Sequence, residues 1–146
     1  MSLNPTMTRE EREAFLADVH VGVLSVAEEG RGPCAVPVWY RYTPGDVVRI
    51  TVPPESRKTG LLRKAGRASL VVQVETTPAK YVSVEGPVEV QQAPVAEDQR
   101  IIAERYLGKK LADRYLASMP GLEHELLVLL NPERWWSVDF SKLKLK

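Results

Sequence analysis

The sequence predicts an α+β fold, a small antiparallel β-barrel of six to seven strands with short peripheral helices. Short runs rich in β-branched residues are separated by turn residues, which is typical of strands joined by hairpins. Between residues 94 and 118 the apolar period changes to four, which is typical of helices. The chain has 146 residues, so we expect a single domain over residues 1–146.

The first half of the chain is expected to contain one helix and three strands. Thr8 and Glu11 form a capping-box pattern, which predicts that a helix begins directly after Thr8. The expected strands cover residues 21–27, 34–42 and 47–52. Between the last two, Pro44 and Gly45 occupy the centre of a type II turn pattern, which predicts a hairpin.

The second half returns to strands after two helical segments. Ser56 can cap a short helix that runs to about residue 65 and ends at Gly66. Gly108 divides the helices expected after residue 94. The remaining strands are expected at 68–74, 81–90, 126–130 and 135–140, with turns around Pro78 and at 131–133. Closing these strands into a barrel would remove exposed sheet edges.

The composition argues against several classes of function. Twenty Lys and Arg against nineteen Asp and Glu leave a net charge of +1, which disfavours binding to nucleic acid or to a membrane surface. No apolar run approaches the roughly 20 residues of a membrane span. Cys34 is the single cysteine and cannot form an internal disulfide, so we expect a cytoplasmic protein. His20 and His124 lack partners at metal-ligand spacing, so no metal site is expected.

The start of the helix after residue 56 carries the strongest electrostatic signal. A helix N-terminus has a partial positive charge, so cations are normally disfavoured in its first turn. Arg57 and Lys58 nevertheless follow the cap Ser56 directly. A bound phosphate would accept hydrogen bonds from the helix start and from both side chains. The alternative is a solvated basic surface helix, with Glu55 as a partial counter-charge.

Pro37 interrupts the strand expected at 34–42. Because proline cannot donate to a β-ladder, this strand should lie at a sheet edge, contain a bulge, or face a ligand. An edge strand that proline protects from edge-to-edge pairing is an equally good interpretation of the residue alone.

Several motifs in order resemble the core signature of the pyridoxamine 5′-phosphate oxidase-like split barrels. They are Glu55-Ser56-Arg57-Lys58, Gly66-Arg67-Ala68-Ser69-Leu70 and Val82-Ser83-Val84-Glu85-Gly86. Their order and spacing match over roughly residues 7 to 90. The segments Arg105-Tyr106-Leu107-Gly108 and Trp136-Ser137-Val138-Asp139 are similar to an actinobacterial branch that includes F-420 (deazaflavin) enzymes.

The resemblance implies a homodimeric oxidoreductase that uses FMN or F-420 for hydride transfer on a small organic substrate. It implies that Ser56, Arg57 and Lys58 hold the cofactor phosphate. The other residues implied to contact the cofactor are Val36, Pro37, Val38, Trp39, Thr51, Val52 and Tyr81. The cofactor supplies the chemistry, so no catalytic residue is identified in the chain.

Two departures from the oxidases matter. Tyr81 stands where those enzymes carry a phosphate-contacting Gln, and it either donates one hydrogen bond or packs. The Arg-x-His pair for the vitamin substrate is missing from residues 135–143, so oxidation of vitamin B6 is not expected. The missing Gln weakens FMN as the cofactor, the C-terminal segments favour F-420, and both stay open.

The positions of several basic and aromatic residues in the fold would bear on the choice of cofactor and on dimer formation. Arg41, Arg63 and Lys80 are candidates for a basic groove along the longer anionic F-420. Trp135 and Trp136 should point to opposite faces of a strand, one into the core and one toward a dimer partner or the cofactor. A non-catalytic cofactor-binding or sensing module is the alternative function, and a purely structural dimerisation barrel is a third.

Overall fold

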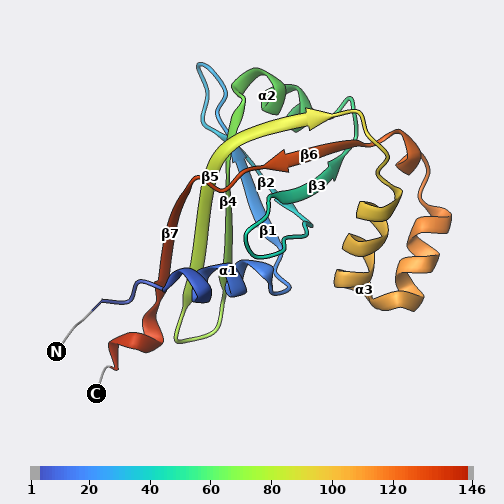
Figure 1. Cartoon of the computed structure of the whole chain (residues 1–146). Coiled ribbons are helices and arrows are strands. Elements are labelled where there is room, and N and C mark those ends of the chain that lie inside the picture. The colour runs from blue at the N-terminus through green and yellow to red at the C-terminus, as the bar shows by residue number, and fades with distance from the viewer. Residues whose placement is uncertain (1–3, 145–146) are drawn as a thin grey trace.

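A computed structural model describes residues 4–144 (Figure 1). The helices and strands follow the chain in the order α1 (Arg9–Ala17), β1 (Gly22–Val26), β2 (Cys34–Val38), β3 (Val48–Val52), α2 (Arg57–Ala65), β4 (Arg67–Val74), β5 (Lys80–Gln91), α3 (Ala96–Ser118), β6 (Leu126–Leu130) and β7 (Arg134–Asp139). Short 3-10 helices cover Leu122–His124 and Phe140–Leu143. The predicted α+β class, with an antiparallel half-barrel and peripheral helices, is confirmed.

The seven strands of the described residues form one curled antiparallel sheet in the order β2-β1-β4-β5-β6-β3, with β7 also paired to β5. Strand β5 is long enough to serve both halves of the barrel, and it arches across the molecule in Figure 1. Its residues 80–85 pair with β7, and its residues 88–91 pair with β6. The two halves therefore share one continuous strand.

The turn expected at residues 131–133 does not form a hairpin. Asn131 N donates to Pro87 O at 3.0 Å, and Glu133 N donates to Glu85 O at 2.9 Å. Strands β6 and β7 consequently lie end to end along β5. Gly86 permits this close approach, because a Cβ atom there would lie 1.8 Å from the carbonyl oxygen of Asn131. This crossing explains why the Val-Glu-Gly segment ends in glycine.

The hairpin expected between β2 and β3 is also largely absent. The predicted turn is present, with Gly45 at a φ of 85° and Asp46 N donating to Thr43 O at 2.9 Å. Among the described residues, a single bridge connects the segment that follows β2 to β3, between Arg41 and Arg49. Because β1 and β6 take β2 and β3 as their partners, the barrel stays split between these two strands.

The core lies inside the curled sheet, where alternate residues of each strand are buried. Leu24, Ile50 and Leu70 are among the side chains that are almost completely enclosed. Leu16 of α1 and Leu62 of α2 are fully buried against this core. No helix within residues 4–144 has both the length and the apolar character that crossing a bilayer requires.

Local signals located the helix ends correctly. Both hydrogen bonds of the Thr8–Glu11 capping box are present, at 2.9 and 3.2 Å. Ser56 caps α2, and Gly66 ends it in the left-handed conformation with a φ of 69°. Gly108 interrupts α3 at a φ of 77°, and Figure 1 shows the two halves of α3 side by side.

Candidate functional site

A cavity of about 220 Å³ opens at the seam between β2 and β3. We call it the seam cavity. Its walls come from both edge strands, from the start of α2, from both halves of α3 and from the segment before β6. The lining residues are Pro37, Val38, Trp39, Ile50, Thr51, Lys58, Gln99, Ile102, Ala103, Tyr115 and Glu125. Five of these were predicted cofactor contacts: Pro37, Val38, Trp39, Thr51 and Lys58.

The edge of β3 presents backbone polar groups to this cavity. Arg49 exchanges two hydrogen bonds of 3.0 Å with Arg41 across the seam, so the backbone N–H and C=O of Arg49 point toward β2. Along a strand, backbone groups two residues apart point to the same side. The N–H and C=O of Thr51 therefore face the seam, and no backbone partner reaches them there from the part of the chain that the structure describes.

The edge of β2 forms the opposite wall. Within residues 4–144, β2 pairs only with β1, so the edge position predicted from Pro37 is confirmed. Pro37 lies opposite Val23 in this pairing. Its ring leaves the seam side of β2 without a backbone donor at that residue, and it contributes an apolar surface to the cavity.

The two cations at the start of α2 point to different surroundings. Successive residues of a helix are turned by about 100°, so adjacent side chains leave the helix in different directions. Lys58 lines the seam cavity and forms no ion pair with any carboxylate of residues 4–144. Arg57 instead pairs with Glu28 of the β1–β2 turn and contacts the Cys34 sulfur at 3.8 Å. The structure brings one of the two predicted cations to the cavity.

The remaining predicted contacts lie outside the cavity lining. The Ser56 hydroxyl forms a hydrogen bond with Thr59, with 2.7 Å between their side-chain oxygens, and Ser56 caps the helix two residues before Lys58. Val52 is fully buried in the core, and Val36 packs partly against the core from β2. Tyr81 lies on β5 opposite Val138 of β7, and it is 36% exposed.

Helix α3 supplies the wall that sequence reasoning missed. Asp98 is buried and accepts bonds from Arg41 at 2.8 Å and Arg49 at 2.7 Å. The carboxylate raises the pKa of Arg49. Arg41 and Arg49 form the only bridge across the described seam. Their ion pairs with Asp98 therefore hold the start of α3 next to the gap between β2 and β3.

Gln99 and Tyr115 give the α3 wall its polar character. The Gln99 amide donates to Leu122 O at 2.6 Å and to the Glu125 carboxylate at 3.0 Å. Burial, with a smaller contribution from Glu125, raises the pKa of Tyr115. The Tyr115 hydroxyl therefore stays protonated at neutral pH and is a hydrogen-bond donor. The four-residue period predicted these helices, but no local pattern indicated that they cover the seam.

The Arg-Tyr-Leu-Gly segment has a structural role here. The Arg105 guanidinium donates to Ala17 O at 2.6 Å and also contacts Asp18 O, both at the C-terminal end of α1. The Tyr106 hydroxyl donates to His20 O at 2.6 Å, and its ring stacks on Trp39 at 4.9 Å between centroids. These contacts hold Trp39 in the cavity wall.

The candidate basic groove does not assemble around the cavity. Arg41 is bound to Asp98, and Lys80 pairs with Asp139 at 3.8 Å. Arg63 lies in the exposed last turn of α2. Residues 4–144 contain no group of three or more His, Cys, Asp and Glu side chains that could hold a metal ion.

A family model described as pyridoxamine 5′-phosphate oxidase matches residues 8–139, nearly the whole chain. The chain belongs to the pyridoxamine 5′-phosphate oxidase family. The resemblance inferred from the motifs is thereby confirmed. No protein of curated function matches the sequence.

Solved structures similar to this member of the pyridoxamine 5′-phosphate oxidase family share its fold. A conserved hypothetical protein of Mycobacterium tuberculosis is 23% identical, with a TM-score of 0.78, over 100% of this chain and 93% of the other. An F420 reductase is 21% identical, with a TM-score of 0.62, over 85% and 94%. An FAD and heme binding protein of Mycobacterium smegmatis is 17% identical, with a TM-score of 0.68, over 93% and 73%.

The polar and charged groups that line the seam cavity of this family member are chemically suited to a flavin or deazaflavin. Such a cofactor combines a flat ring, whose edge carries polar atoms, with a phosphate. The free backbone edge at Thr51 suits the polar edge of a ring. Lys58 at the start of α2, which has no ion-pair partner among residues 4–144, suits a phosphate. Trp39 and Pro37 add flat apolar surface.

Proposed function

We propose that the chain binds FMN or F-420 in the seam cavity and catalyses hydride transfer on a small organic substrate. Family membership and the likeness to structures described as binding FAD or reducing F420 support this function. The observation that carries it is the position of Lys58. Lys58 has no ion-pair partner among residues 4–144, and its position at a helix start beside a free strand edge suits an anionic cofactor.

The chain's own residues would bind and orient the cofactor. Lys58 and the first backbone N–H groups of α2 would hold the phosphate, and Thr51 would bond the polar edge of the ring. Trp39, fixed by Tyr106, would keep water from one side. When bound, the cofactor supplies the hydride carrier. Oxidation of pyridoxamine phosphate is not proposed, because the substrate-binding Arg-x-His pair is absent from residues 135–143.

We further propose that a second copy of the chain completes the site. Pockets for small ligands usually measure about 300–1,000 Å³, and the seam cavity of one chain is smaller, at about 220 Å³. As predicted, Trp135 and Trp136 face opposite sides: Trp135 packs against the core, and Trp136 is 54% exposed. Trp136 and Tyr81 therefore offer aromatic surface on the outer face of the sheet for a homodimer.

Sedimentation of the purified protein tests the dimer. We expect a dimer for the wild type and a weaker one for Trp136→Ser, because truncating a buried aromatic contact removes a large part of an interface. Trp136 is exposed in the single chain, so the substitution should leave the fold intact. A monomeric wild type that still binds the cofactor would contradict this part of the proposal.

Titration with FMN and F-420, followed by fluorescence, tests cofactor binding. Lys58→Ala removes a charge-assisted contact of about 1.5–3 kcal/mol, so we expect Kd to rise at least about tenfold. Arg57→Ala should have a smaller effect, because Arg57 is already paired with Glu28. Lys64→Ala is the matched control, since Lys64 lies exposed in the last turn of the same helix. Equal affinities of wild type and Lys58→Ala would overturn the site.

A non-catalytic binding module is the second candidate. The likeness to a structure described only as binding FAD and heme favours it. Two results together would support this alternative. The cofactor would bind tightly, with an affinity that depends on Lys58, and the bound cofactor would exchange no hydride with chemical reductants or with nicotinamide donors.

A further inference from the structure

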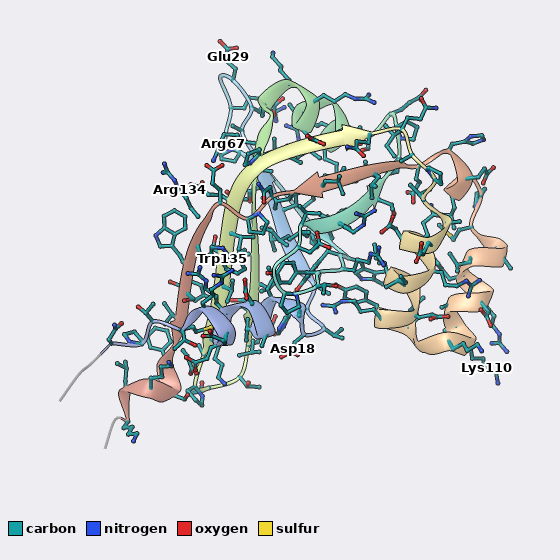
Figure 2. All side chains as sticks on the ribbon, viewed as in Figure 1. Asp18, Glu29, Arg67, Lys110, Arg134 and Trp135 are labelled. Atoms are coloured by element: carbon teal, nitrogen blue, oxygen red, sulfur yellow. The ribbon has the colours of Figure 1, made fainter. Side chains whose placement is uncertain are left out.

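A second cavity of about 190 Å³ lies apart from the seam cavity. It is formed where α1, the turn between β2 and β3, and the junction of β6 with β7 meet. None of its lining residues lines the seam cavity. Trp135, labelled in Figure 2, belongs to its wall. We call it the α1 cavity.

Arg12 of α1 is a cation that lines the α1 cavity. Its guanidinium carbon lies 4.7 Å from the centre of the Trp135 ring, which holds the planar group in place. Its Nε atom is buried and has no hydrogen-bond partner among the described residues. No carboxylate of residues 4–144 forms an ion pair with Arg12. The cation is therefore partly desolvated and uncompensated by the protein, which strengthens its attraction for an anion.

The acidic residues of the α1 cavity have partners other than Arg12, and one of these partners, Arg9, also lines the cavity. Glu13 pairs with Arg9 at 3.5 Å. The carboxylate of Asp46 accepts a hydrogen bond from Val47 N at 2.7 Å. Neither satisfies the guanidinium of Arg12, although both are in the cavity wall.

Two uncharged donors face the same space. The buried Tyr42 hydroxyl accepts a hydrogen bond from Gly45 N at 3.3 Å, so its own proton is free to be donated. Burial raises the pKa of Tyr42, which keeps that proton in place at neutral pH. The side-chain amide of Asn131 forms no hydrogen bond with the described residues.

We propose that the α1 cavity binds a small oxyanion, the carboxylate or phosphate group of a small molecule. A guanidinium is the group best suited to two oxygens of such an anion. The Tyr42 hydroxyl and the Asn131 amide would donate to the remaining oxygens. This site is independent of the cofactor site, and it does not depend on the proposed oxidoreductase function.

Calorimetric titration with sodium phosphate and with sodium acetate, at constant ionic strength, tests the site and separates the two oxyanions. The protein is used in its Lys58→Ala form, in which anion binding at the seam cavity is weakened. We expect one saturable site for at least one of the two anions. Adding Tyr42→Phe, which removes only the hydroxyl, should weaken binding at least about fivefold, and adding Arg12→Gln should abolish it.

The matched control is Arg31→Gln, which removes an exposed arginine of the β1–β2 turn and should leave the affinity unchanged. Tyr42→Phe keeps the ring that packs near Trp135, so it reports on binding even if Arg12→Gln disturbs folding. Absence of saturable binding of either anion would overturn the proposal. Binding that Tyr42→Phe leaves unchanged would also overturn it.

Discussion

Two glycines of α2 show how one residue type serves opposite purposes. Gly60 lies within the helix with open space around it, whereas Gly66 ends the helix at a φ of 69°. We expect Gly60→Ala to stabilise the protein by about 0.5–1 kcal/mol, because alanine restricts the unfolded chain. Gly66→Ala should destabilise it by about 1–2 kcal/mol, because a Cβ atom disfavours the left-handed conformation.

Urea unfolding of both variants measures the two effects in one helix. The opposite signs are the informative result, since both substitutions add the same methyl group. Stabilisation by Gly66→Ala would show that α2 does not end in the conformation described.

The cofactor site is only partly predictable from the sequence, because some of its side chains have partners far away in the chain. Lys58 was found from a local electrostatic rule, because the helix start and the cation lie within a few residues. Arg57 obeyed the same rule in the sequence, yet its partner Glu28 lies 29 positions away and could not be anticipated. Long-range pairing thus decided which of two adjacent cations reaches the cavity.

At the scale of elements, α3 depends on one buried carboxylate. Asp98 binds Arg41 and Arg49, and it is almost fully buried. We expect Asp98→Asn to destabilise the protein by about 3 kcal/mol, because two arginines lose a shared charged partner. Its exposed neighbour Glu97 provides the control Glu97→Gln, with an expected effect within about 0.5 kcal/mol.

Thermal and urea unfolding measure these changes, and cofactor titration of Asp98→Asn adds a second readout. Since α3 forms one wall of the seam cavity, loosening its start should also weaken cofactor binding. An Asp98→Asn protein with wild-type stability would contradict the role assigned to this ion cluster.

The ends of helices could be predicted because they depend on neighbouring residues. The pairing of strands could not be predicted, because it depends on residues far apart in the sequence. The cap at Thr8, the stop at Gly66 and the break at Gly108 depend on neighbouring residues, and all three were placed correctly. The turn at Pro44 and Gly45 formed without its hairpin, because β3 pairs with the distant β6. Gln99, Tyr115 and Glu125 reach the cavity through the same long-range packing and carry no motif.

In the whole molecule, the gap between β2 and β3 is what creates the candidate cofactor site. An ordinary barrel would pair these strands and leave no free backbone at Thr51. Here β5 spans both halves of the sheet, the crossing at Gly86 directs β6 toward β3, and one bridge closes the seam. The fold thereby leaves a polar strand edge next to the cation of α2 and beneath α3.

The structure of the protein with bound FMN or F-420 tests cofactor binding at the seam cavity most directly. We expect the ring edge to bond the backbone of Thr51, the phosphate to lie within hydrogen-bond distance of the Lys58 ammonium group, and a second copy to close the open side of the cavity. A cofactor bound elsewhere, with the Lys58 side chain in solvent and the seam cavity empty, would contradict the assignment of the seam cavity as the cofactor site.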